Sequence, residues 1–212
     1  DAYAPLVRRA GGTPVFVTLR PPHWRYDGAG IEAAVTPRTR VALGSALVHA
    51  ARGCDDEGAT SLHEALVVGQ DAAPSFAAAA SRELGHVEFL RGRYDRALIW
   101  LRQAAALAGD DRAEQARIAI VRGVVLSDTA HYGAAIEVLR GAAALVGQVG
   151  DLRQQSYALA MVGRVLLLHG ELDAAGKTLD QALALAQQCW MAFTPWPNSL
   201  RAEVDLMRGD VK

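Results

Sequence analysis

The chain has 212 residues, of which 51% are apolar, and its formal net charge is −1. This composition predicts one or two folded domains with apolar cores and excludes an intrinsically disordered tail. A charge near zero produces no broad field that attracts phosphate backbones, so direct nucleic-acid binding is not expected. The sequence contains no apolar run of membrane-spanning length and no signal-peptide pattern at its start, which predicts a cytoplasmic location.

Residues 1–43 differ in pattern from the rest of the chain. The double glycine at 11–12 precedes an alternating strand-like run over 15–19, and a short helical run over 30–35 ends before Pro37. The order helix, strand, helix, strand predicts a small α/β segment. Two strands do not form a stable sheet alone, so this segment is expected to pack on the first repeats or to be partly disordered.

This segment resembles a fragment of the fold-type I pyridoxal-phosphate-dependent aminotransferases. The resemblance rests on Asp-x-Tyr-x-Pro at 1–5, Gly-Gly-x-Pro-Val at 11–15 and Ala-Val-Thr-Pro-Arg-Thr-Arg at 34–40. It implies a pyridoxal-phosphate cofactor, but the Asn-Pro-x-x-Pro motif of that family does not follow. The chain has only two lysines for a Schiff base, Lys177 and Lys212. No cofactor is therefore expected, and a remnant of such an enzyme fused to a repeat adaptor is kept as the alternative.

Residues 44–212 contain an internal repeat, which is best seen from five small residues that we call the register marks. They are Ala46, Gly85, Gly123, Gly163 and Ala202, and they are spaced 38 to 40 residues apart. After the three central marks, further positions agree: glycine or alanine follows at +7, tyrosine or leucine at +9, alanine at +12, leucine at +16 and alanine at +19. Such self-similarity is typical of stacked repeats.

The pattern predicts two helices per repeat, separated by a turn at the +7 position. Apolar residues three and four apart continue through each helix, and Gly92 and Gly170 stand where the first helix of a repeat ends. A small residue at the mark is expected to let the two helices approach closely, with the small residue at +12 as its counterpart. The predicted helices span 44–52, 57–69, 75–91, 94–108, 112–129, 132–147, 151–169, 172–189 and 196–208.

Helical hairpins of this kind resemble tetratricopeptide repeats and imply a mainly α fold, a right-handed solenoid with a concave surface. The usual period of that family is about 34, so each unit here carries four to six extra residues between hairpins. The longer repeat is similar to that of large ATP-dependent LuxR-type regulators of the maltose-activator class. The runs 82–94, 125–132, 193–197 and 202–206 carry this resemblance. The phosphate loop and the basic recognition helix of such regulators are not found in this sequence.

Catalytic and metal-binding patterns are not found either. The six histidines lack an i, i+4 partner, and Cys54 and Cys189 belong to no Cys-x-x-Cys pair. Acidic groups such as Asp110 and Asp111 are better explained as helix starts. We therefore expect a protein that is not an enzyme and that holds no metal.

Two groups of residues are candidates for binding. Arginines recur on or near the first helices of the hairpins, which would line the concave groove and accept an anionic effector or an acidic peptide; solvated helix faces are the alternative. These residues are Arg93, Arg117, Arg122, Arg153 and Arg164. Trp190, Phe193 and Trp196 belong to an aromatic stretch at 189–198, which forms either a binding lip or, as we favour, a connector packed on the repeats.

The sequence thus predicts a non-enzymatic scaffold, the repeat arm of a bacterial transcriptional regulator, which senses a protein or a small effector in its groove. A generic adaptor without a link to transcription is a further alternative. Homo-oligomerisation is left open, and no membrane partner is expected.

Overall fold

The computed structural model of the protein describes residues 59–60, 62–63, 66–67 and 74–210. The predicted α/β segment 1–43, the helix 44–52, the domain boundary near Gly44 and Lys212 lie outside these residues. The described residues form helices and the turns between them, and none of them is in a strand. The described members of the predicted helix 57–69 are helical.

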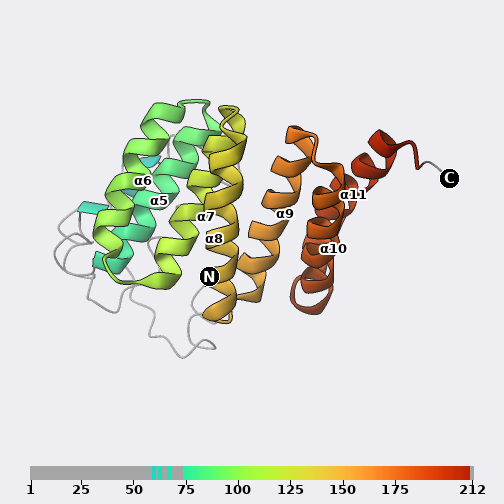
Figure 1. Cartoon of the computed structure of the whole chain (residues 1–212). Helices are drawn as coiled ribbons and strands as arrows, with labels where there is room; N and C mark the ends of the chain where they lie inside the picture. Colours follow the sequence, from blue (N-terminus) through green and yellow to red (C-terminus); the bar gives the residue numbers. More distant parts are fainter. Residues whose placement is uncertain (1–58, 61, 64–65, 68–73, 211–212) are drawn as a thin grey trace, which may run out of the picture.

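Seven long helices follow one another from residue 74 onward (Figure 1). Every predicted helix in this region is confirmed, and each end agrees within one residue. The elements are α5 (Pro74–Leu90), α6 (Tyr94–Ala108), α7 (Arg112–Asp128), α8 (Tyr132–Gln148), α9 (Leu152–His169), α10 (Leu172–Cys189), the 3₁₀ turn η1 (Met191–Phe193) and α11 (Pro195–Arg208).

The helices form hairpins that stack in chain order, from the green α5 and α6 to the red α11 in Figure 1. We call α5, α7, α9 and α11 the first helices and α6, α8 and α10 the second helices. Successive first helices contact one another, whereas no comparable contact joins successive second helices in the described part of the chain. A stack with this asymmetry curves toward its first helices. We call their common surface the first-helix wall.

Each hairpin closes around the glycine at its register mark. A Cβ at Gly123 would lie 2.4 Å from Leu139 Cγ, and a Cβ at Gly163 would lie 2.6 Å from Leu179 Cγ. These distances are too short for two carbon atoms, and a densely packed interior leaves the leucine little room to move away. The mark therefore requires glycine in these two hairpins.

The predicted counterpart at +12 contacts the mark through its backbone in two hairpins: the Ala97 carbonyl oxygen lies 3.2 Å from a Cβ on Gly85, and that of Ala175 lies 3.5 Å from a Cβ on Gly163. The nearest side chain, however, is the leucine at +16. The pairs are Gly85–Leu101, Gly123–Leu139 and Gly163–Leu179.

A column that the sequence analysis missed joins each first helix to the preceding hairpin. Valine stands two residues after the mark in all four described first helices and is buried in each: Val87, Val125, Val165 and Val204. The last of these approaches α10, where its Cγ1 lies 3.6 Å from the position of a Cβ on Gly176. The mark therefore packs toward the helix that follows, and the valine two residues later packs toward the helix that precedes.

The turns at +7 share one backbone shape. At the end of α7, the N–H of Ala130 donates to the Ser127 carbonyl at 3.0 Å and the N–H of His131 donates to the Leu126 carbonyl at 2.8 Å. The equivalent bonds close α5 and α9, where the left-handed residue is glycine. Ala130 adopts the same conformation with φ of 61°, which brings its Cβ close to the carbonyl oxygen.

Replacing Ala130 with glycine should therefore stabilise the protein. Ala130→Gly relieves this clash, and we expect the free energy of unfolding to rise by about 1 kcal/mol. Urea denaturation followed by circular dichroism measures the change. As a matched control, Ala144→Gly in the exposed interior of α8 should lower the free energy of unfolding by about 1 kcal/mol. Equal losses in both variants would contradict the left-handed assignment.

Candidate partner-binding surface

One register position shows how the chemistry of the first-helix wall changes along the stack. Six residues before each mark stand Ala79, Arg117, Tyr157 and Trp196 on α5, α7, α9 and α11. The rings of Tyr157 and Trp196 stack across neighbouring first helices, with centroids 6.2 Å apart. Arg117 instead reaches the start of α9, where its Nη2 lies 2.9 Å from Asp151 Oδ2. At this position the wall thus carries a charge on α7 and aromatic rings on α9 and α11, and Arg82 and Glu83 add charges on α5.

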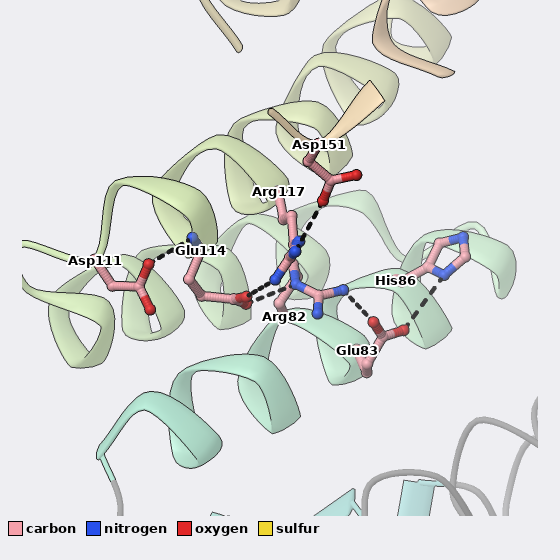
Figure 2. A network of polar contacts seen from close by, with 7 residues as sticks. All are labelled: Arg82, Glu83, His86, Asp111, Glu114, Arg117 and Asp151. Atoms are coloured by element: carbon pink, nitrogen blue, oxygen red, sulfur yellow. Dashed lines mark hydrogen bonds and ion pairs between the residues drawn. The ribbon is translucent and has the colours of Figure 1, made fainter. Parts of the chain in front are cut away.

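The charged half is a network that joins three first helices (Figure 2). Arg82 on α5 donates from Nε to Glu114 Oε1 on α7 at 2.7 Å, and its Nη1 contacts the neighbouring Glu83. Glu114 is only 4% exposed, so these contacts are largely removed from water. Asp151 accepts from Arg117 and also accepts the N–H of Gln154 at 3.2 Å, so one carboxylate caps α9 and holds α7.

The ionised forms of Arg82 and Glu83 are stabilised in this network. Burial lowers the pKa of Arg82, but the charges and hydrogen bonds of Glu83 and Glu114 outweigh burial and raise that pKa overall. Burial likewise favours the protonated form of Glu83, yet the hydrogen bond from His86 and the charge of Arg82 hold its pKa below the ordinary value. The charges of Arg82 and Glu83 are thus stabilised in the folded chain, and the network fixes neighbouring helices to one another.

Glu83 should make the stability depend on pH in a defined direction. Because its pKa is lower in the folded chain, its contribution is full above the unfolded value of about 4.5 and is lost as the pH falls through the folded pKa. The difference in unfolding free energy between wild type and Glu83→Gln should thus be largest near pH 7 and should shrink below about pH 4. Urea titrations at several pH values measure it.

Glu137→Gln serves as the control for this titration. Glu137 is exposed on α8, and no ion pair involves it in the described part of the chain. Its substitution should give a difference from wild type that stays small at every pH. A difference for Glu83→Gln that grows on acidification would contradict the lowered pKa.

The structure does not bring the five predicted arginines together. Arg93 immediately precedes α6, a second helix, and lies 3.6 Å from Glu88 at the turn. Arg117 is held by Asp151 and Glu114, and Arg164 donates to Asp128 Oδ1 at 3.0 Å. Arg122 is exposed on the side of α7 that faces α6 and α8, beside open hollows of about 550 and 600 Å³. Only Arg153 extends beside the predicted aromatic residues.

Tyr157 and Trp196 of the aromatic half of the wall form a cluster with Trp190 and Phe193 of the connector after α10. We call these four half-buried rings the aromatic patch. Trp190 and Phe193 stack with centroids 4.5 Å apart and an interplanar angle of 10°. Phe193 also contacts Tyr157 at 5.9 Å and Trp196 at 5.6 Å. The stretch 189–198 therefore contacts α9 through Tyr157, and its roles as a binding lip or as a packed connector both stay predictions. Tyr157, which completes the patch, was missed because it precedes Trp190 by 33 residues in the sequence.

The electrostatics of the aromatic patch are set by two arginines. Arg153 Nε donates to the Cys189 carbonyl at 3.3 Å, and its guanidinium carbon lies 6.0 Å from the centroid of the Trp190 ring. No carboxylate pairs with Arg153 among the described residues, so its charge is not neutralised there. Burial raises the pKa of Tyr157, and the nearby charge of Arg164 only partly opposes this effect. The patch thus combines open ring surface with a cation.

The described part of the chain gives little support to metal binding, a membrane span or a pyridoxal-phosphate site. Its histidines, cysteine and carboxylates form no group of three that could hold a metal ion. None of its helices is long and apolar enough to cross a membrane. Lys177 is exposed on α10 and lines neither hollow, so the described residues do not fit a Schiff-base site for pyridoxal phosphate.

Comparison with known sequences gives one family match. The model of the DegT/DnrJ/EryC1/StrS aminotransferase family matches residues 2–88. This agrees with the aminotransferase resemblance of residues 1–43, and the match continues through residue 88, within α5. The described residues 74–88 belong to a helix that packs in the repeat stack. No curated protein matches the sequence.

Solved structures resemble the chain over most of its length. BtubC (BKLC) of P. vanneervenii shares 17% identity, with a TM-score of 0.67, over 86% of this chain and 74% of the other. The TPR-like repeats of a candidate kinesin light chain from Podosopora anserina share 14% identity at a TM-score of 0.62, over 82% and 88%. Pseudomonas aeruginosa PilF shares 22% identity at a TM-score of 0.62, over 80% and 68%.

Identities this low establish the fold alone. The predicted all-helical repeat architecture is therefore confirmed, whereas the LuxR-type regulator remains a prediction. The described part of the chain has the stacked helical-hairpin fold of tetratricopeptide-like repeats.

Proposed function

We propose that the protein is a non-enzymatic binding scaffold and that it recognises its partner at the aromatic patch of the first-helix wall. The observation that supports this function most directly is the placement of four half-buried rings beside Arg153, whose charge has no carboxylate partner among the described residues. Aromatic side chains and arginine are the residues that most often dominate binding energy at protein interfaces.

The partner that fits this surface best is a protein segment with an apolar or aromatic residue next to an acidic residue. The apolar side chain would cover the stacked face of Trp190 and Phe193, and the carboxylate would pair with Arg153. A small anionic effector with a planar ring has the same chemistry. The charged half of the wall is less suited to binding, because Arg82, Glu114 and Arg117 already satisfy one another.

The finer proposal is that this scaffold is the sensing arm of a bacterial transcriptional regulator. The period of 38 to 40 residues and the runs at 82–94, 125–132, 193–197 and 202–206 support it, because they resemble the LuxR-type regulators of the maltose-activator class. The gene sequence beyond Lys212 tests it. A helix-turn-helix domain encoded there is the expected result, and a stop codon directly after Lys212 would leave an adaptor role instead.

The binding surface can be tested with peptides selected on the wild-type chain from a random display library. We expect acidic sequences with an aromatic or apolar residue, whose dissociation constant rises at least about tenfold with Trp190→Ala and with Arg153→Ala. Affinity should also fall as salt rises. Arg140→Ala, on the exposed face of α8, is the matched control and should leave binding unchanged.

Circular dichroism shows whether each variant keeps the helical content of the wild type. If Trp190→Ala loses helical signal, the milder Trp190→Phe takes its place. Selected peptides that bind Trp190→Ala and Arg153→Ala as tightly as wild type would contradict the proposed surface. Binding that is lost equally in Arg140→Ala would do so as well.

A second candidate function follows from the family match to residues 2–88, which favours a remnant of a pyridoxal-phosphate enzyme. The cofactor supplies an electron sink when it is bound as a Schiff base to lysine. Its test is the absorbance of the chain after incubation with pyridoxal phosphate. A one-to-one Schiff-base band that disappears in Lys177→Ala would support the enzyme. We expect no such band, since Lys177 is exposed on α10.

A further inference from the structure

We propose that the turn between α5 and α6 holds a further binding site, at which Arg93 and Arg96 bind a phosphate monoester dianion. This site goes beyond the proposed function, because neither arginine belongs to the aromatic patch, which lies on α9, α11 and the connector after α10. The proposal rests on a buried carboxylate that gathers arginines, on hydrogen-bond donors that are not used, and on a comparison with the equivalent turns of the chain.

One buried carboxylate gathers three arginines at this turn. Glu88, near the end of α5, is only 7% exposed, and its Oε1 accepts from Arg91 Nη1 at 2.9 Å. Its other oxygen, Oε2, lies 3.6 Å from Arg93 Nη1 and 4.0 Å from Arg96 Nη1. Arg93 is the last residue before α6, and Arg96 belongs to the first turn of that helix. Glu88 therefore holds both guanidinium groups beside the same oxygen atom.

The charges of Arg93 and Arg96 are only partly neutralised at this turn. Among the described residues, Glu88 is the only carboxylate that pairs with either of them, and it is already hydrogen-bonded to Arg91. The side chains of Arg93 and Arg96 are 52% and 68% exposed. Their positive charge therefore faces solvent, where an anion can reach it.

The guanidinium groups of Arg93 and Arg96 also keep their hydrogen-bond donors available. Neither group donates a hydrogen bond within the part of the chain that the structure describes, because their contacts with Glu88 Oε2 are too long. Oε2 is itself buried and accepts no hydrogen bond from these residues. Guanidinium groups with open N–H donors bind phosphate oxygens strongly and in a defined geometry. Glu88 thus positions the two arginines by charge and leaves their donors to a ligand.

The equivalent turns show that the hairpin does not require this arrangement for folding. Three residues after the mark, α5 carries Glu88, whereas α7 and α9 carry Leu126 and Leu166. Arg96 stands eleven residues after the mark, where the next two hairpins carry alanine. Replacing a buried ion pair by apolar residues of similar volume is often neutral or stabilising. The stability of the hairpin therefore does not account for the carboxylate and its arginines.

A phosphate monoester suits this pair of arginines better than a carboxylate does. Its dianion carries more charge and more acceptor oxygens, so it can accept from both guanidinium groups at once. The start of α6 adds to the attraction, because no side chain caps it and its first N–H groups carry partial positive charge. Asp95 in the same turn opposes the ligand, but it is exposed and pairs with neither arginine in the described part of the chain.

Phosphorus NMR titrations of the full chain test the site with two probes, free O-phosphoserine and a short alanine peptide that carries one phosphoserine. We expect the dissociation constant to rise at least about tenfold with Arg93→Ala and with Arg96→Ala, since each variant removes a charge-assisted contact. Affinity should also fall below about pH 6, where the phosphate takes up a proton. Tighter binding of the peptide would assign the site to a phosphorylated protein, and equal binding would assign it to a free phosphate ester.

Matched variants separate a local contact from a change in net charge. Arg140→Ala removes the same charge from the exposed face of α8 and should leave phosphate binding unchanged. Asp95→Asn should strengthen binding about twofold, because it removes a repelling charge.

Three results would overturn the proposal. They are the absence of binding to both probes, binding that Arg93→Ala and Arg96→Ala leave intact, and an equal loss of binding in Arg140→Ala. The arginine variants should keep the helical circular dichroism signal of the wild type, because both side chains are exposed. Trp190→Ala should leave phosphate binding unchanged, so failure of this proposal is distinguishable from failure at the aromatic patch.

Discussion

Gly123→Ala is expected to lower the free energy of unfolding by about 3 kcal/mol, at the upper end of the cost of overpacking a dense core. The added Cβ would lie 2.4 Å from Leu139 Cγ and 2.7 Å from its Cδ2. Leu139 is fully buried in the largest apolar cluster of the described residues, so it has no space into which it can move. The two helices of the hairpin would have to separate, which also weakens the contacts of α8 with α9.

Gly141→Ala is the matched control for this prediction, because it is the same chemical change in the neighbouring helix. Gly141 is exposed in the interior of α8, and nothing lies within 4 Å of a Cβ built there. Alanine has the higher helix propensity, so this variant should raise the free energy of unfolding by about 1 kcal/mol. Urea denaturation of both variants measures the contrast. Stabilisation of similar size in both would show that the hairpin does not require glycine at its mark.

Glu114→Gln is expected to lower the free energy of unfolding by about 3 kcal/mol, because it removes one partner from a buried ion pair. Glu114 is 4% exposed and accepts from Arg82 across two first helices. Without its charge, the guanidinium of Arg82 stays buried, and Glu83 is its only carboxylate partner among the described residues. The loss comes from this uncompensated charge, whereas the net value of the intact pair is smaller.

Two further variants define the origin of that loss. Asp180→Asn removes the exposed partner of Arg201 and should change the free energy of unfolding by less than about 0.5 kcal/mol. Arg82→Met combined with Glu114→Gln should be more stable than Glu114→Gln alone, because it removes the unpaired cation. Urea denaturation at neutral pH measures all three. If Glu114→Gln costs no more than Asp180→Asn, the network of Figure 2 does not hold the first helices together.

Helix positions were predictable because their signals are local. The apolar spacing within 75–91 or 172–189 and the glycines at 92 and 170 act through residues a few positions apart, and such signals define where a helix begins and ends. Even Ala130 was placed correctly in a turn, because the repeat supplied the register where glycine was missing.

The candidate surface was only partly predictable, since it depends on residues of different helices. The sequence showed that arginine recurs on the first helices. It did not show that Arg117 pairs with Asp151 while Arg153 lies beside Trp190. The aromatic stretch was identified, yet Tyr157 joins it only because α9 and α11 are neighbours in the stack. Aligning the repeats at six residues before the mark would have revealed this column.

The sequence by itself thus determined the order of the seven long helices, their ends to within one residue, and their repeat period, but not the 3₁₀ turn η1. The tertiary structure decided which side chain each glycine accommodates and which arginines are neutralised. The physical reason is distance. Backbone turns and apolar periodicity act over a few residues, whereas Cβ contacts and ion pairs join positions 16 to 36 residues apart, and these meet only when the hairpins close and stack.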